Sequence, residues 1–400
     1  MRVLVLPGYR YPASLDEPII CGDLRNTFNL SRALARTGHQ VSVLTRGTAH
    51  DPASHALDGV AIHRYRGELA RVFPTSFDVS RRRVRLFREL CRRVDGIVAS
   101  TPLTLELLHP ASKTPTMIYV CSGLEDARNY GRSAGEWVQG LGLRLLRDPA
   151  KRATWARSAL VNTTAELEAT TLVRMGVPPQ KILTIGPGVE LERYAPAPVA
   201  AVEAVVARHF PPEARGRRLV LSVSRFTPAK GILETISAFA RLRDRVRDAY
   251  LLLVGVRHSH RADYPLRIRR LIASLELGPH VGIIENLPES LLPACYSAAS
   301  VTSVFSVGYD PLPTTIIESM ACGTPVVAND FATRAQMITR GQDGILVPER
   351  DERAWARAVE HLLSDDAHAG MLRDNALARV RVQFDMDRVA ERYVEAFASA

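Results

Sequence analysis

Two stretches of this chain, about eighty residues apart, share one order: a short apolar run, a loop broken by glycine or proline, and then a helix. The first runs from Leu219 to Gly231 and continues as a helix near Ile232, and the second occupies Val301–Gly323. Short apolar runs bounded by turn residues are typical of buried strands. In an open parallel sheet, ligands bind where such strands end and the next helices begin. The two stretches therefore predict an α/β fold with a ligand site.

The alternation of strands and helices begins with the apolar run Arg2–Gly8 and resumes at Leu219. This pattern predicts two doubly wound, Rossmann-like halves. A length of 400 residues suits two or three domains, and a hydrophobic content of 46% suffices for sizeable cores.

The domain boundaries follow from the position of the prolines and from the last helical pattern. We predict a first domain at residues 1–190 and a second at residues 215–375. The segment Tyr194–Arg217 contains four prolines and is interpreted as a linker. Within residues 376–400, we predict a final helix at Met386–Ala398.

Two carboxylates flank the second loop, Asp310 before the predicted helix and Glu318 within it. Because carboxylates accept hydrogen bonds in pairs, both suit the vicinal hydroxyls of a sugar or a ribose. The first amides of the helix starting at Thr314 are unpaired donors that favour a diphosphate. For Glu318 a capping box with Thr315 is the alternative, and Asp310 could equally be an ordinary loop aspartate.

The first loop is cationic, since it carries Arg225 and Lys230. Arginine offers a planar fork and lysine a flexible point charge, which together can neutralise a leaving diphosphate. Lysine is otherwise rare in this chain and occurs elsewhere only at Lys113, Lys151 and Lys181. The alternative is a pair of solvated surface cations in a turn.

These segments carry a resemblance to a known family. SVSRFTPAKG at 222–231 and YDPLPTTIIESMACGTPVVA at 309–328 resemble the family 4 retaining glycosyltransferases of the GT-B fold. CGDLRNTFNLSRALARTGHQVSVLTR at 21–46 resembles the first glycine-containing loop, helix and second strand of that family, and IGPGVELERYAP at 185–196 resembles its crossing between domains. The resemblance spans nearly the whole chain. It implies two Rossmann-like domains facing a cleft, with the last helix packed back on the first domain.

The resemblance also implies roles for single residues. Arg225 and Lys230 match the family's diphosphate-binding pair. Glu318 matches the acid that holds the nucleotide ribose, and Asp310 matches the acid that contacts the hydroxyls of the donor sugar. The family usually has glutamate in place of Asp310, so the shorter side chain affects which hydroxyl is read. The other donor-binding positions implied are Gly22, Leu312, Pro313, Thr314 and Thr315.

One segment departs from the family. The apolar run that starts at Thr116 ends where many relatives carry a histidine near the reacting sugar carbon, and this chain has Cys121 or Ser122 there. We expect either a different donor contact or a divergent N-terminal half. The alternative is an ordinary strand end with a buried thiol and a turn serine.

The formal net charge of +10 raises the question of nucleic-acid binding. The densest basic run, Arg81–Arg93, has Val84, Phe87 and Cys91 at helical spacing, which indicates a helix with one buried face and one solvated arginine face. A membrane-surface or acidic-partner role for the arginine face stays open as an alternative. No nucleic-acid recognition motif stands out, so we expect no nucleic-acid partner.

The five cysteines are odd in number and lack paired short spacings, so neither a zinc site nor a disulfide framework is expected. The chain shows no signal-type start and no run of about eighteen apolar residues. We therefore expect a reduced, cytoplasmic setting.

These observations together predict a glycosyltransferase without cofactor or metal. It would move a hexose or N-acetylhexosamine from a nucleotide-diphosphate sugar to a hydroxyl acceptor such as a natural-product core, a sugar phosphate or a glycan. A UDP-sugar is the first expectation for the donor and GDP-mannose the second. The alternatives are a sugar-nucleotide epimerase or hydrolase of the same fold and a non-catalytic nucleotide-sugar-binding protein.

Overall fold

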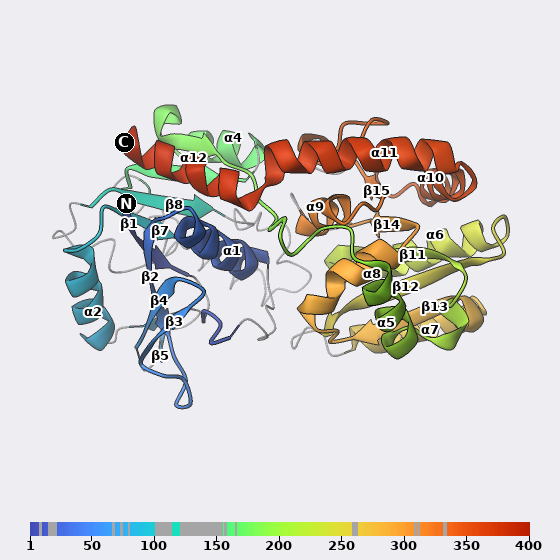
Figure 1. Cartoon of the computed structure of the whole chain (residues 1–400), viewed down its shortest axis with the longest axis horizontal. Helices are drawn as coiled ribbons and strands as arrows, with labels where there is room; N and C mark the ends of the chain where they lie inside the picture. The colour runs from blue at the N-terminus through green and yellow to red at the C-terminus, as the bar shows by residue number, and fades with distance from the viewer. Residues whose placement is uncertain are drawn as a thin grey trace. The chain divides into compact units, whose positions relative to one another are not determined.

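The chain folds into two compact units, seen in a computed structural model (Figure 1). The N-terminal unit comprises Met1–Pro187 together with Met386–Ala400, and the C-terminal unit comprises Gly188–Asp385. The structure describes residues 1–7, 10–14, 22–65, 69–72, 75–78, 81–100, 114–120, 155, 158–164, 166–257, 263–307, 310, 313–330 and 334–400.

Within these residues, the N-terminal unit contains an eight-stranded sheet that is parallel except for its last edge strand. In order across the sheet, the strands are β10 (Ile182–Thr184), β9 (Leu160–Thr163), β8 (Thr116–Val120), β7 (Gly96–Ala99), β1 (Arg2–Leu6), β2 (Gln40–Arg46), β4 (Val60–Tyr65) and β3 (Ser54–Leu57). A separate antiparallel hairpin is formed by β5 (Leu69–Val72) and β6 (Thr75–Asp78).

Helices cover both faces of this sheet. They are α1 (Gly22–Arg36), α2 (Arg81–Cys91), α4 (Glu166–Arg174) and α12 (Met386–Ala398). Alternate residues of β1 enter different cores, because successive side chains of a strand point to opposite faces. Val3 and Val5 pack with α1 and α12, whereas Leu4 and Leu6 pack with α2 and α4. The sheet is therefore buried on both sides, as a doubly wound fold requires.

The final helix α12 is part of the N-terminal unit. The phenol of Tyr393 accepts a hydrogen bond from Nδ2 of Asn162 at 2.7 Å, and Asp387 pairs with Arg36 of α1 at 2.6 Å. The predicted helix at Met386–Ala398 is confirmed.

The C-terminal unit contains a parallel sheet of six strands among its described residues. In order across the sheet, they are β13 (Val281–Glu285), β12 (Ala249–Arg257), β11 (Arg218–Phe226), β14 (Val301–Val304), β15 (Val326–Asn329) and β16 (Ile345–Val347). Its helices are α5 (Val199–His209), α6 (Ile232–Arg243), α7 (Tyr264–Ser274), α8 (Leu292–Ala298), α9 (Thr314–Ala321), α10 (Glu352–Ser364) and α11 (Asp366–Arg379).

This sheet is also buried on both faces. Leu221 and Leu252 belong to the core under α5, α8 and α9. Val220 and Leu251, one residue earlier on each strand, belong to the core under α6, α7 and α10. The sequence prediction of two doubly wound α/β halves is therefore confirmed.

The interpretation of Tyr194–Arg217 as a linker is wrong. The segment holds α5 and a short 3₁₀ turn at Pro212–Ala214, and Tyr194, Val205 and Phe210 are buried in the core of the C-terminal unit. Three of the four prolines, Pro198, Pro211 and Pro212, lie at helix starts, because their fixed φ angle suits the positions before and at the first turn.

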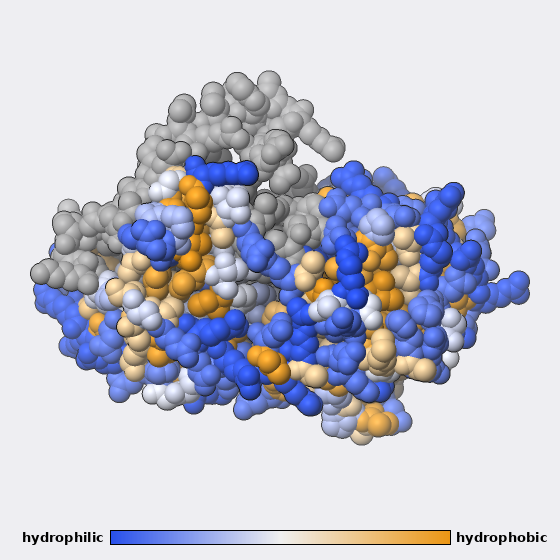
Figure 2. Space-filling view, turned by 90° about the horizontal axis from the view of Figure 1, so that it is seen from above, coloured by the Kyte–Doolittle hydropathy of each residue, from blue (hydrophilic) through white to orange (hydrophobic). Residues whose placement is uncertain are grey.

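The described helices were compared with the length and apolar character of a membrane span. Figure 2 shows hydrophilic residues over much of one face, with apolar residues in separate areas between them. Among the described residues, no helix has both the length and the apolar character needed to cross a bilayer. The basic run forms α2 with Phe87 buried and Arg85 and Arg88 exposed, which confirms the predicted helix with an arginine face.

Candidate functional site

Two loops meet at the carboxyl edge of the sheet in the C-terminal unit. They follow β11 and β14, which are neighbours in the sheet, so residues about eighty positions apart come together. The amide of Val307 donates a hydrogen bond to the carbonyl of Ala229 at 3.0 Å and ties one loop to the other.

Gly231 makes this close approach of the loops feasible. Its φ is +62°, in the left-handed region, and a Cβ at this position would lie 1.8 Å from the carbonyl oxygen of Phe305. Glycine is therefore required twice, for the backbone conformation and for the lack of a side chain. The glycine fixes the position of the preceding residue, Lys230.

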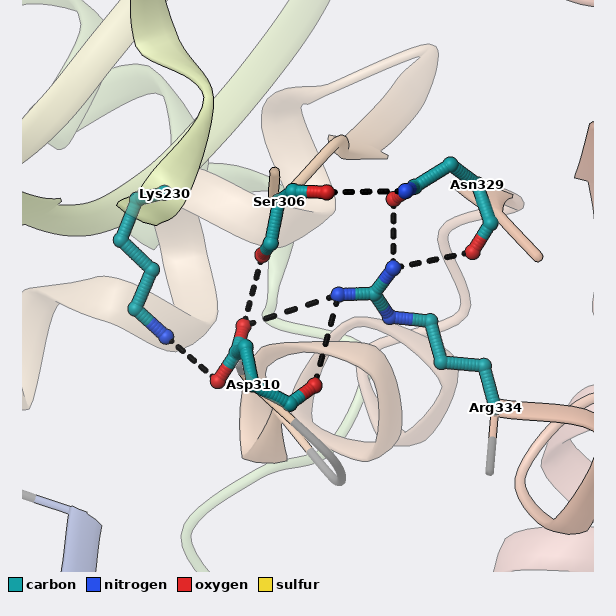
Figure 3. A network of polar contacts seen from close by, with 5 residues as sticks. All are labelled: Lys230, Ser306, Asp310, Asn329 and Arg334. Atoms are coloured by element: carbon teal, nitrogen blue, oxygen red, sulfur yellow. Dashed lines mark hydrogen bonds and ion pairs between the residues drawn. The ribbon is translucent and has the colours of Figure 1, made fainter. Parts of the chain in front are cut away.

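Lys230 and Asp310 form an ion pair across the two loops. Nζ of Lys230 lies 2.7 Å from Oδ1 of Asp310, and the hydroxyl of Ser306 donates to Oδ2 at 2.7 Å (Figure 3). Burial raises the pKa of Asp310, but the nearby charges of Lys230 and Arg334 outweigh it, so the pKa lies below its ordinary value. Asp310 is therefore ionised at neutral pH.

A buried arginine supports the same carboxylate. The guanidinium of Arg334 is fully buried, and its Nη2 lies 3.7 Å from Oδ2 of Asp310 and 3.5 Å from its carbonyl oxygen. Nη1 of Arg334 donates to both the carbonyl and the side-chain oxygen of Asn329, and Nδ2 of Asn329 donates to the carbonyl of Ser306. Figure 3 shows the resulting closed set of contacts around Asp310.

Arg334, Asn329 and Ser306 were not predicted from the sequence. Arg334 begins a 3₁₀ turn, Arg334–Gln336, after β15, and Asn329 ends that strand. Burial lowers the pKa of the Arg334 guanidinium, and the carboxylates of Asp310, Glu349 and Asp330 act in the opposite direction. Nothing in the local sequence marks this arginine among the many exposed ones, because its contact with Asp310 is long-range.

The predicted cation Arg225 lies near the end of β11 and is partly buried. Its side chain makes no hydrogen bond or ion pair with any residue that the structure describes. A guanidinium without an internal partner is suited to an external anion. Lys230, by contrast, already bonds a carboxylate.

The start of α9 also offers unpaired donors. The helix begins at Thr314 with Pro313 as its N-cap and no side-chain capping bond, and within the described residues the amides of Thr314 and Thr315 have no partner. Such amides carry partial positive charge. The capping-box alternative for Thr315 and Glu318 is wrong, because Thr315 lies inside the helix and not at its cap.

Glu318 lies one turn further along α9, and its residue is buried. Its Oε2 accepts a hydrogen bond from the phenol of Tyr296 in α8 at 2.8 Å. The structure thus places this carboxylate on the inner side of the helix that carries the unpaired amides.

The remaining predicted positions are described only in part. Gly22 is the first residue of α1 in the N-terminal unit. Leu312, Cys121 and Ser122 lie outside the described residues.

One group of candidate metal ligands occurs among the described residues, away from the two loops. His361, Asp365 and His368, at the junction of α10 and α11, each offer one ligand atom within 4.8 Å of the others. The sequence patterns considered above did not single out this group or the Asp-x-Asp spacing of Asp385 and Asp387, of which Asp387 pairs with an arginine of α1. Neither group includes a residue of the loops after β11 and β14.

The fold recurs in solved structures. Sucrose-phosphate synthase from Thermosynechococcus elongatus superposes with a TM-score of 0.77 at 24% identity, over 100% of both chains. HepE from Anabaena, solved in complex with UDP, superposes with a TM-score of 0.73 at 16% identity, also over 100% of both chains. At these identities the likeness concerns the fold.

The sequence profile described as Glycosyl transferases group 1 matches residues 207–379, and the one described as Glycosyltransferase Family 4 matches residues 25–193. The fold and both profiles define the chain as a GT-B glycosyltransferase-fold protein. Within that class it belongs to glycosyltransferase family 4.

Curated relatives are similar at lower coverage. The chain is 29% identical to D-inositol 3-phosphate glycosyltransferase from Salinispora tropica over 57% of this chain and 48% of the relative. It is 27% identical to the protein of the same name from Acidothermus cellulolyticus, over 96% of this chain and 87% of the relative. A GDP-mannose-dependent α-(1-6)-phosphatidylinositol monomannoside mannosyltransferase from Mycolicibacterium smegmatis is 31% identical over 46% of this chain and 48% of the relative. In the first matches the chain spans about half the length of the relatives.

Proposed function

We propose that this protein transfers a hexose or N-acetylhexosamine from a nucleotide-diphosphate sugar to a hydroxyl group of an acceptor. The observation that carries the proposal is the Lys230–Asp310 pair, which joins the two loops at the carboxyl edge of a parallel sheet. This edge is where open α/β sheets bind nucleotides. The amides of Thr314 and Thr315, which have no partner among the described residues, come four and five residues after Asp310 and supply further donors.

The proposed chemistry uses charge on both sides of the breaking bond. As the bond between the anomeric carbon and the diphosphate breaks, negative charge grows on the leaving group, where Arg225, Lys230 and the α9 amides stabilise it. Asp310 accepts a hydrogen bond from a hydroxyl of the sugar and orients it.

The acceptor oxygen then forms the new bond to the anomeric carbon from the side of the leaving group. The acceptor proton passes to a phosphate oxygen of the donor, so no side chain of the protein has to act as the base. The configuration of the sugar is retained. The protein cations replace the divalent ion of metal-dependent transferases.

The nucleotide and the acceptor are proposed from the ribose contact and from the relatives. Glu318 is proposed to hold the ribose, and from the family resemblance Gly22, Leu312 and Pro313 are proposed as further donor-binding residues. UDP is favoured first because the Anabaena structure contains UDP, and GDP-mannose second because of the Mycolicibacterium relative. Among the acceptor classes, relatives named for inositol 3-phosphate favour a phosphorylated polyol. We propose that the reaction takes place in the reducing cytoplasm, in agreement with the free thiols of Cys295 and Cys322.

A thermal-shift panel with UDP, GDP, dTDP, ADP and their sugars tests the proposal. A ligand at a hundred times its dissociation constant stabilises the fold by about 2.7 kcal/mol, which is readily detected. The stabilising donor is then incubated with inositol phosphate and simple glycosides, and the products are followed by mass spectrometry.

The outcomes separate the functional classes. A new glycoside together with free nucleoside diphosphate supports the transferase. Free nucleotide without a glycoside indicates a hydrolase or epimerase, and binding without release indicates a non-catalytic binding protein. If no nucleotide stabilises the protein, the proposal is rejected.

A further inference from the structure

Asp310 has two cationic neighbours of different kinds. Lys230 reaches it from the loop after β11, and its side chain is 18% exposed. Arg334 reaches it from the turn after β15, and its side chain is 0% exposed. Lysine is a point charge on a flexible stem, whereas arginine is a planar fork that holds its partners in fixed directions. Of the two cations, only Lys230 is open to solvent.

The two oxygens of the carboxylate are held differently. Oδ1 contacts Lys230 at 2.7 Å. Oδ2 accepts from the hydroxyl of Ser306 at 2.7 Å and faces Arg334 at 3.7 Å. Ser306 and Arg334 each form a hydrogen bond with Asn329, and all three residues are buried (Figure 3). Oδ2 is therefore fixed from within the protein, while Oδ1 is held by a residue at the surface of the site.

A bound donor competes for Lys230. In the proposed function Lys230 stabilises the diphosphate, and its ammonium also contacts Asp310 at 2.7 Å. If the ammonium turns toward the phosphates, Asp310 loses one of its two shortest contacts. A carboxylate in such surroundings stays ionised only if another charge and other hydrogen bonds compensate it. Ser306 and Arg334 are already in place to do so.

We propose that Arg334 is a positioning residue that keeps Asp310 ionised and aimed when Lys230 is drawn to the diphosphate of the donor. The inference rests on the proposed function. It gives the two cations of the site different roles, since Lys230 exchanges one anion for another and Arg334 remains on the carboxylate throughout. The second cation explains why the site can offer a carboxylate to the sugar and an ammonium to the phosphates at the same time.

The experiment compares Arg334→Met, Arg334→Lys and a matched control, Arg245→Met. Arg245 is exposed and pairs with Glu360 of α10, and neither residue belongs to the loops after β11, β14 and β15. We expect Arg334→Met to lower kcat about a hundredfold while the affinity for bare nucleoside diphosphate changes less than about threefold. Arg334→Lys should recover part of kcat, and Arg245→Met should match the parent.

The pH profile separates positioning from a merely structural role. Removal of the Arg334 charge lets the pKa of Asp310 rise toward its ordinary value. The acidic limb of the profile of kcat against pH should therefore move to higher pH. A purely structural loss would lower the melting temperature and leave that limb in place. The proposal would be overturned if the acidic limb of the profile stays at the same pH. It would also be overturned if the affinity for nucleoside diphosphate falls by the same factor as kcat.

A double-mutant cycle with Asp310→Asn gives an independent reading. If Arg334 acts through Asp310, then Arg334→Met should have little effect on kcat in the Asp310→Asn background. An equal fold-loss in both backgrounds would overturn the proposal. The double variant also keeps the test usable if Arg334→Met alone does not fold, because it leaves neither charge buried without its partner.

The inference and the proposed function can fail separately. If the parent protein consumes no nucleotide sugar, the proposed function is rejected. The coupling between Arg334 and Asp310 is then measured from the free energy of unfolding as a function of pH. Asp310 has a lowered pKa in the folded state, so its stabilisation is present above its unfolded pKa and is lost as pH falls through the folded value. This loss should be smaller in Arg334→Lys, and absent in Asp310→Asn. An Arg334→Lys profile identical to that of the parent would refute the coupling.

Discussion

At the scale of single residues, the ion pair between Lys230 and Asp310 is the feature on which the proposed function depends. The sequence pattern placed each residue in a loop and the family resemblance gave each a role, but neither indicated that they contact each other at 2.7 Å. In the proposed function the diphosphate therefore meets an ammonium that already bonds Asp310. Arg225 carries no such contact among the described residues.

We predict that Lys230→Ala and Arg225→Ala each lower kcat by about a hundredfold or more, because each removes positive charge that stabilises the departing diphosphate. Steady-state kinetics with the donor found in the thermal-shift panel measures the effect. Arg241→Ala, an exposed arginine paired with Glu352 on the helices α6 and α10, is the control and should keep the parent rate. If Lys230→Ala or Arg225→Ala transfers sugar at the rate of the parent protein, the assignment of that residue to the diphosphate is wrong.

The two acids should respond differently to loss of charge. We predict that Glu318→Gln chiefly weakens the binding of bare nucleoside diphosphate, whereas Asp310→Asn lowers turnover and leaves that binding intact. The reason is that Glu318 is proposed to meet the ribose and Asp310 the sugar. Isothermal titration calorimetry with the bare nucleotide measures both affinities.

The opposite pattern, with affinity lost only in Asp310→Asn, would reverse the two roles. Because Glu318 also accepts a hydrogen bond from Tyr296, its variant is compared with Tyr296→Phe, which removes the bond and keeps the carboxylate. Equal losses of affinity in the two variants would indicate a structural role for Glu318.

At the scale of elements, the sequence predicts what is local and misses what is distant. The strands that became β11 and β14 and the starts of α6 and α9 follow from apolar runs, turn residues and helix signals, and all four are confirmed. The interpretation of Tyr194–Arg217 as a linker was wrong because Pro198, Pro211 and Pro212 lie at the beginning of helical turns. The contact of Arg334 with Asp310 was beyond prediction, since it depends on the order of strands in the sheet.

The junction of the two loops should be sensitive to a single methyl group. We predict that Gly231→Ala lowers the free energy of unfolding by more than Gly341→Ala does. Both glycines have positive φ, +62° and +68°, but only a Cβ at Gly231 meets another atom within 4 Å, the Phe305 carbonyl at 1.8 Å. The backbone conformation alone costs alanine about 1–2 kcal/mol, and the clash adds to it at Gly231.

Urea unfolding of the two variants measures the difference. Gly231→Ala should also lower kcat, because the loop that positions Lys230 must move away from β14. Equal unfolding free energies in the two variants would show that the close approach of the loops does not contribute to stability.

At the scale of the whole molecule, we predict that sugar transfer needs no divalent metal and retains the anomeric configuration. Arg225, Lys230 and the α9 amides already supply the positive charge that a divalent ion would provide. Retention rests on the family. Assays with EDTA and NMR of the anomeric proton of the product measure the two properties.

Loss of activity with EDTA that Mg²⁺ restores would contradict metal independence, and an inverted product would contradict retention. The double variant His361→Ala/His368→Ala is assayed alongside. It removes the described group of candidate metal ligands, so any effect of a chelator through that group disappears.

The order of the units along the chain also affects the order in which they fold during synthesis on the ribosome. The C-terminal unit is one uninterrupted stretch, Gly188–Asp385, and can complete its core as soon as that stretch has emerged. The N-terminal unit cannot, because Met386, Val389 and Tyr393 of α12 belong to the core that contains β1. The half that is synthesised first is therefore the half whose core is completed last, because one face of its sheet has only part of its apolar cover until α12 has been made.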